Sequence, residues 1–144
     1  MMLICAFVGM LLAEETVRSF GYLFVALSGI ALCSASAAAI NQVIDRNTDA
    51  SMTRTDQRPL PKGELSATHA SVFAFVIGVI GALILYFYVN TLTMILTIAS
   101  LIGYAFIYTI YLKRATPQNI VIGGLAGAAP PLLGWSSITN TIDP

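Results

Sequence analysis

The sequence predicts an all-α integral membrane protein, and three observations carry that prediction. Hydrophobic residues make up 57% of the 144 residues and charged residues only 10%, whereas a soluble domain has about 25% charged residues. The mean hydropathy is +0.82. The apolar residues also fall in long runs, near the length of about 20 residues that a membrane-spanning helix needs. The formal net charge is zero, so no basic field indicates a nucleic-acid partner.

The apolar runs predict about five transmembrane helices joined by polar connections. They cover residues of about 1–13, 22–44, 68–89, 92–112 and 119–137. The first run is short for a membrane span, so we expect either a helix truncated at its start, which we favour, or a re-entrant segment. A signal peptide is disfavoured because the run lacks a basic start and a small-residue cleavage site.

Small residues recur within the later runs and indicate closely packed helices. The stretch Ser34–Ala39, Gly78 with Gly81, and the glycines at 123, 124 and 127 belong to this group. Pro130 and Pro131 must break or kink the last helix, which can mark a cavity or ordinary helix packing. Cys5 and Cys33 lie inside apolar runs, and we interpret both as small buried hydrophobic residues rather than a disulfide.

The charges of the connections predict the orientation. Basic residues gather in the second connection, with Arg46, Arg54, Arg58 and Lys62, and in the fourth, with Lys113 and Arg114, while the turn between them is uncharged. The positive-inside rule places these two connections on the cytoplasmic side. The expected localisation is therefore a multi-pass protein of a membrane, with its charged loop in the cytoplasm.

A polar stripe ends the second helix. Asn41, Asp45 and Asp49 are spaced by four residues, and each step of four turns the helix face by only about 40°. Their oxygens suit Mg²⁺, which binds carboxylates together with waters and substrate phosphates. An Asp facing lipid is costly, so we expect Asp45 to face a wet cavity.

Basic residues follow the stripe at once. Arg54, Arg58 and Lys62 repeat the spacing of four, and guanidinium and ammonium groups bind phosphate. Eight of the fourteen charged residues lie between Asp45 and Glu64, four of each sign. Two interpretations stay open from these charges alone: a solvated, charge-balanced loop, or a site for a metal–diphosphate substrate.

The order of residues in this loop resembles a known family. The pattern N-x-x-x-D-x-x-x-D-x-x-M-x-R-T-x-x-R-P-L, from Asn41 to Leu60, is similar to the first aspartate-rich motif of the UbiA-type intramembrane prenyltransferases. A second stretch, from Tyr111 to Trp135, resembles the members of that family that prenylate haem. Together the two motifs cover about a third of the chain. Gln42 departs mildly from the motif, and the family's second aspartate-rich motif has no counterpart, because Asp143 stands alone. We therefore expect residues 1–144 to be a partial prenyltransferase domain, the N-terminal portion.

The resemblance implies a fold, a reaction and roles for residues. The fold would be part of a nine-helix bundle with a catalytic loop at about 45–66, in a bacterial inner membrane. The reaction would transfer a farnesyl group from farnesyl diphosphate to a vinyl group of haem b. The family's pattern assigns catalysis to Asp45, Asp49, Arg54 and Arg58. It assigns Mg²⁺ binding to Asn41, Asp45 and Asp49, and diphosphate binding to Asn41, Arg54, Arg58, Lys62, Lys113 and Arg114. Haem A synthase is a candidate partner beside the lipid bilayer.

Other interpretations remain beside this one. A related enzyme could use 4-hydroxybenzoate or another quinone precursor as acceptor. A transporter subunit could also carry intramembrane Asn and Asp, but it should place them at mid-membrane and show paired repeats. Tyr104, Tyr108 and Tyr111 share one helical face and could line a cavity, although interfacial anchoring is favoured. His69 follows Ser66 by three residues, which indicates a capped helix start rather than a haem ligand.

Overall fold

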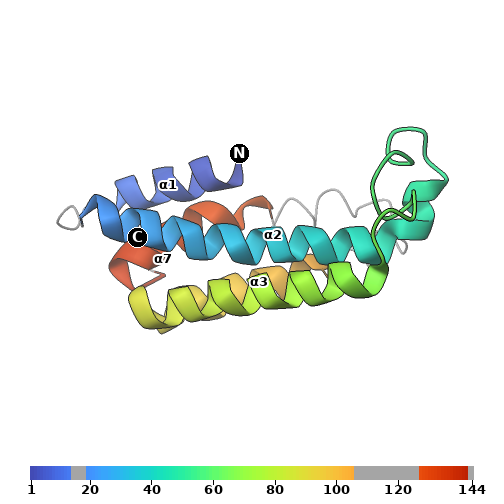
Figure 1. Ribbon diagram of the computed structural model, residues 1–144. Coiled ribbons are helices and arrows are strands. Elements are labelled where there is room, and N and C mark those ends of the chain that lie inside the picture. The colour runs from blue at the N-terminus through green and yellow to red at the C-terminus, as the bar shows by residue number, and fades with distance from the viewer. Residues whose placement is uncertain (14–18, 106–126, 143–144) are drawn as a thin grey trace.

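The computed structural model describes residues 1–13, 19–105 and 127–142. In these ranges the chain forms helices and no strand. The helices are α1 (Met2–Leu12), α2 (Phe20–Ala50), α3 (Ala67–Tyr88), α4 (Thr91–Ile102) and α7 (Ala129–Thr139). They lie lengthwise beside one another, and the loop that follows α2 stands at one end of the molecule (Figure 1). The all-α prediction is confirmed for these parts of the chain.

The prediction of about five transmembrane helices is met only in part. Among the described helices, α2 with 31 residues and α3 with 22 are long and apolar enough to cross a membrane. The helices α1 and α4 are apolar but shorter. The predicted helix over 92–112 extends outside the described residues, and so does the start of the one predicted over 119–137. Two of the described helices therefore meet the length and composition that a membrane span requires.

Helix α2 is longer than the sequence indicates. It continues to Ala50, six residues past the predicted end at 44, so Asp45 and Asp49 are helical and the loop begins at Ser51 rather than at 45. The polar composition of residues 45–50 is typical of a loop. No Gly or Pro interrupts them, however, and polar side chains on one face do not stop a helix whose backbone bonds continue.

Polar side chains cap the starts of α2, α3 and α4. Ser19 accepts a hydrogen bond from the backbone N–H of Tyr22, and Ser66 accepts one from that of His69. Asn90 accepts one from Thr93 at 2.7 Å. Each satisfies a backbone donor that a helix start leaves unpaired. The predicted cap at Ser66 is confirmed, and the exposed His69 ring lies 2.9 Å from the Ser66 hydroxyl.

Glycines let α2 and α3 pack backbone to backbone. A Cβ on Gly81 would lie 2.9 Å from the carbonyl oxygen of Gly29 and 2.8 Å from Sγ of Cys33, closer than real Cβ contacts. Ser36 donates a 2.7 Å hydrogen bond to the carbonyl of Ala74 across the same interface. The predicted close packing is thus confirmed at Gly78 and Gly81, while the glycines at 123 and 124 lie outside the described residues.

The last helix begins where the two prolines predicted a break. Pro130 and Pro131 occupy the first turn of α7, where a missing N–H costs nothing. Helix α7 then packs on α1 so closely that a side chain on Gly134 would overlap the backbone of Ala6. This contact joins the first and last described segments of the chain.

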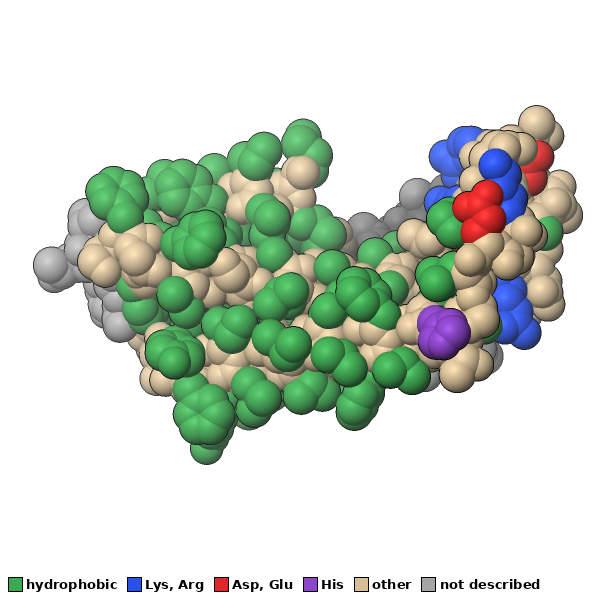
Figure 2. Space-filling view, viewed as in Figure 1, with side chains coloured by type: hydrophobic (Ala, Val, Ile, Leu, Met, Phe, Trp, Pro, Cys, Tyr) green, Lys and Arg blue, Asp and Glu red, His purple; other side chains and the backbone are tan. Residues whose placement is uncertain are grey.

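The surface separates into an apolar body and a charged end. Large hydrophobic residues of α3 are exposed, with Phe73, Phe75 and Phe87 among them, as a lipid-facing helix or a helix awaiting a partner requires. Charged side chains gather at the end formed by the loop after α2 (Figure 2). Cys33 is buried and free, as predicted, but Cys5 is exposed on α1, so the prediction of burial was wrong for Cys5. The short α1 leaves one side of that residue uncovered.

Candidate functional site

The predicted polar stripe exists on the last turns of α2. Asp45 is 3% exposed and Asp49 6% exposed, whereas the intervening Arg46 and Asn47 are on the exposed face. Asn41 is half-buried on the same side. The helical spacing of four therefore places the two carboxylates inward, on the face of α2 opposite to the exposed Arg46 and Asn47.

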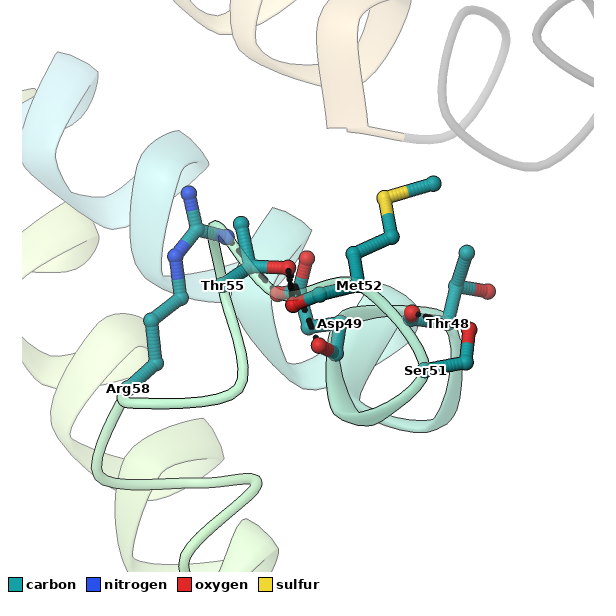
Figure 3. A network of polar contacts seen from close by, with 6 residues as sticks. All are labelled: Thr48, Asp49, Ser51, Met52, Thr55 and Arg58. Carbon is teal, nitrogen blue, oxygen red and sulfur yellow. Dashed lines mark hydrogen bonds and ion pairs between the residues drawn. The ribbon is translucent and has the colours of Figure 1, made fainter.

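Asp49 is held by an arginine from the loop. The guanidinium Nη1–H of Arg58 donates to Oδ2 of Asp49 at 2.7 Å, as Figure 3 shows. The Asp49 side chain is 8% exposed and the Arg58 side chain 39%. One charge is thus buried and the other reaches out to solvent, so the pair keeps a positive group accessible directly above the stripe.

Thr55 folds the loop back so that Arg58 reaches Asp49. Its buried hydroxyl donates to the carbonyl oxygen of Asp49 at 2.9 Å, and its backbone N–H donates to Met52 O at 2.9 Å. The Ser51 hydroxyl donates to Thr48 O at 2.7 Å. These side-chain bonds add to those from the backbone N–H groups of Ser51 and Met52 to the same Thr48 and Asp49 carbonyls, at the helix end where carbonyls lack intrahelical partners. In the sequence, Thr55 is one position of the family motif, and its role in holding the loop against α2 was not predicted. A threonine a few residues after the end of a polar helix is the feature that could have indicated it.

The other basic residues predicted to bind the diphosphate are either exposed on the loop or lie outside the described residues. Arg54 and Lys62 are exposed on the loop. Both lie four residues from Arg58 in the sequence and add positive charge near it, but no described contact joins either of them to the stripe. Lys113, Arg114, Tyr108 and Tyr111 lie outside the described residues. The structure therefore brings together Asp45, Asp49 and Arg58 from the predicted set, with Asn41 one turn away.

The donor chemistry of the stripe fits a partly hydrated Mg²⁺. Within the described ranges no group of three or more His, Cys, Asp or Glu could hold a metal ion. The stripe offers two carboxylates and one amide oxygen. Such a set is too small for an all-protein cage, and it suits an ion that completes its shell with waters and substrate phosphates.

A cavity continues the same face of α2 away from the charged end. It has a volume of about 220 Å³ and lies among α1, α2, α4 and α7. Its α2 wall consists of Cys33, Ser34, Ala37 and Ala38, and Ala38 precedes Asn41 by one turn. Tyr104 lines it just after the end of α4, as the cavity interpretation of this tyrosine predicted, and interfacial anchoring stays a prediction. Its walls are apolar with a few hydroxyls, which an apolar chain can fill.

A second hollow lies beneath the loop. This groove of about 580 Å³ is lined by α2, α3 and loop residues that include Gln42, Leu60 and His69. It faces the side of α2 next to the stripe, and His69 is one of its lining residues; the histidine lies on the surface near the charged end (Figure 2). The histidine has its cap bond to Ser66 and no described metal-binding neighbours, as a helix-start residue should.

The chain matches known proteins along its whole length. The UbiA prenyltransferase family matches residues 2–144. Protoheme IX farnesyltransferase 2 of Pseudoalteromonas atlantica is 61% identical over 142 residues, which is 99% of this chain and 47% of the relative. Protoheme IX farnesyltransferase of Idiomarina loihiensis is 60% identical over 99% of this chain and 48% of the relative. That of Hahella chejuensis is 56% identical over 100% of this chain and 48% of the relative.

The matched relatives are about twice as long as this chain, so the chain spans about half the length of the curated relatives that it matches. No solved structure matches it. Because the family match covers nearly every residue, including the stripe, the loop and the cavity wall, the chain belongs to the UbiA prenyltransferase family.

Proposed function

We propose that the whole protein transfers a farnesyl group from farnesyl diphosphate to a vinyl group of haem b, giving haem O. The observation that carries this is the continuity of a buried carboxylate stripe with an apolar cavity on one face of α2. A substrate with an ionic head and an apolar tail fits that arrangement. The relatives named protoheme IX farnesyltransferase, at 56% to 61% identity, favour haem b over a quinone precursor as the acceptor.

The head of the substrate would lie at the charged end. Asn41, Asp45 and Asp49 would hold Mg²⁺, which supplies charge neutralisation for the departing diphosphate when bound. Arg58, already 2.7 Å from Asp49, would donate to diphosphate oxygens, with the exposed Arg54 and Lys62 adding positive charge. Lys113 and Arg114 are further candidates for this role. Donors placed beforehand where negative charge develops lower the barrier to breaking the C–O bond.

The tail of the substrate would lie in the cavity. The apolar walls keep water away from the allylic carbon once its bond to oxygen breaks, so that the haem vinyl group captures it first. A new carbon–carbon bond forms to the terminal vinyl carbon. Water then adds to the vinyl carbon next to the ring and loses one proton, which completes the hydroxyethylfarnesyl group.

The setting follows from the same residues. We infer a multi-pass protein of a bacterial inner membrane, with the loop after α2 on the cytoplasmic side, because basic residues concentrate there. Haem A synthase is the candidate partner, since it would consume the product. The charged residues that the structure describes collect at one end of the helices rather than midway along them, which disfavours a transport pathway.

The test compares two acidic residues of the charged end in the whole protein. Asp45→Ala should lower haem O formation by about 10²-fold or more, with unchanged membrane insertion. Glu64→Gln is the matched control, because Glu64 is exposed in the same loop and lies off the stripe, and it should keep full activity. Haem O is quantified by chromatography of the haems extracted after incubation with farnesyl diphosphate, haem b and Mg²⁺. Full activity of Asp45→Ala would contradict the proposal.

A further inference from the structure

We propose that the closed end of the cavity sets the length of the isoprenoid chain that the protein accepts, and that Thr97 is the residue that decides it. The inference rests on the proposed function, because it concerns the tail of the same prenyl diphosphate. It assigns to a threonine of α4, outside both sequence motifs, the selection among chains of two, three and four isoprene units.

The cavity has a near end and a far end relative to the carboxylates. Along α2 the lining residues run from Ala38, nearest to Asn41, to Cys33, which lies twelve residues, or about 18 Å, before Asp45. The start of α4 lies at the opposite end of the molecule from Asp45, because Asn90 donates to Ser136 O of α7 at 2.9 Å. There the Tyr22 hydroxyl, from the start of α2, donates to the neighbouring Ser137 O at 2.6 Å.

The direction in which α2 and α4 run places Thr97 at the far end of the cavity from the carboxylates. Tyr104, Ser100 and Thr97 all line the cavity, and they follow one another along α4 away from the charged end by about 10 Å in total. Thr97 therefore meets the cavity at the depth of Cys33 on α2. Leu133, the lining residue of α7 nearest to Ser136, stands at the same depth. These three side chains line the far end.

The volume and the depth agree with three isoprene units. An apolar protein cavity of about 150 Å³ holds one benzene molecule, so the 220 Å³ here holds on the order of two isoprene units. The first unit, which carries the diphosphate, would occupy the stretch of about 4.5 Å between Ala38 and Asn41. The third unit then ends against Cys33, Thr97 and Leu133.

Within the described parts of the chain, the Thr97 hydroxyl makes no hydrogen bond that holds the fold together. Thr97 is 3% exposed, yet its Oγ1 has no hydrogen-bond partner among the described residues. Other hydroxyls of the chain close on the carbonyl four residues before, as Ser28 does with Phe24 and Thr139 with Trp135. A buried hydroxyl without a partner is unfavourable. The size of the side chain at 97 can therefore be changed without breaking a hydrogen bond.

The experiment measures chain-length selectivity in the whole, membrane-inserted protein. Haem b is incubated with geranyl, farnesyl or geranylgeranyl diphosphate, and kcat/KM is determined for each donor. Thr97→Phe should fill the far end and lower the ratio of farnesyl to geranyl transfer by about 10-fold or more, since one misplaced methylene alone changes selectivity about 10-fold. Thr97→Ala should raise the ratio of geranylgeranyl to farnesyl transfer. Thr97→Val, equal in size, should keep the wild-type ratios.

The control adds the same bulk on the other side of the helix. Ile95 is 53% exposed on α4, and Ile95→Phe should leave all three ratios unchanged. An active wild type whose ratios are the same in Thr97→Phe and Thr97→Ala would overturn the inference. Should Thr97→Phe fail to insert, the ratios of Thr97→Ala and Thr97→Leu decide. A wild type that transfers none of the three chains would instead contradict the proposed function, so the two failures are distinguishable.

Discussion

The two ends of the described bundle use polar residues in opposite ways. At the end where α7 meets the starts of α2 and α4, polar groups bond within the chain. The Thr93 and Ser136 hydroxyls lie 3.0 Å apart, and Asn90 and Tyr22 bond carbonyls of α7. At the charged end, one buried carboxylate is paired with one arginine, and further bases stand exposed. Groups paired with the chain stabilise the fold, whereas charges left facing outward are available to a ligand.

Among the variants at the two ends, we expect those of Arg58 to have the largest effect on farnesyl transfer. Arg58→Ala should lower farnesyl transfer about 10²- to 10³-fold, the cost of losing one donor aimed at developing charge. The free energy of unfolding should also fall, by about 1–3 kcal/mol, because the buried Asp49 carboxylate loses its partner. Arg58→Lys should recover part of the activity, since an ammonium cannot bind two oxygens in a fork.

The control for this change is another arginine of the same region. Arg46 is exposed on the outer face of α2, so Arg46→Ala should keep its activity. Activity is measured as haem O formed, and stability by thermal unfolding in detergent. Equal losses in the Arg46 and Arg58 variants would show that net charge, rather than position, matters.

Gly81 tests the packed body of the molecule with the next largest effect. Gly81→Val should force α2 and α3 apart, because its Cβ would already meet Gly29 O and Cys33 Sγ, and overpacking costs about 1–3 kcal/mol. Thermal unfolding of the purified protein should shift down accordingly. Gly21→Ala is the matched control, since the nearest atom to its Cβ, Ser19 Oγ, lies 3.8 Å away. Equal stability of the two variants would refute the close helix contact.

Thr55 serves both the fold and the site. Its hydroxyl bonds within the chain, and this bond positions Arg58. Thr55→Val should cost about 0.5–1.5 kcal/mol locally, because the Asp49 carbonyl loses the bond from the Thr55 hydroxyl and keeps only the 3.3 Å bond from the backbone N–H of Met52. Limited proteolysis should then cut the loop at 51–63 faster, and farnesyl transfer should fall about 10-fold. Thr55→Ser should restore both properties. Normal loop protection in Thr55→Val would contradict the positioning role.

Asn90 should give the smallest effect, confined to the structural end. Asn90→Ala removes the cap of α4 and the 2.9 Å bond to Ser136 O, and cap losses cost about 1 kcal/mol. Thermal stability should fall slightly while farnesyl transfer stays unchanged. Asn90→Asp, which keeps the capping oxygen, should recover the cap but not the bond to α7. A large loss of activity in Asn90→Ala would show that the two ends are coupled.

Several features of the site could be predicted because they depend only on local spacing. The stripe of Asn41, Asp45 and Asp49 follows from the helix period, and the cap at Ser66 and the helix start at Pro130 follow from single-residue chemistry. The end of α2 was placed too early, because a charged helix and a charged loop have the same composition. Thr55 and Thr97 were missed because neither stands out by residue type or spacing.

The sequence by itself determined the class of this protein: apolar runs predict helices of membrane-spanning length, and an ordered set of acids and bases matches the family's motif and predicts a phosphate-binding site at one end. Tertiary structure alone decided which of those charges meet. Arg58 reaches Asp49 because the loop folds back through Thr55, and the cavity exists because α1, α2, α4 and α7 converge. Contacts between residues far apart in the chain depend on how helices pack, and packing depends on the fit of whole surfaces rather than on any local pattern.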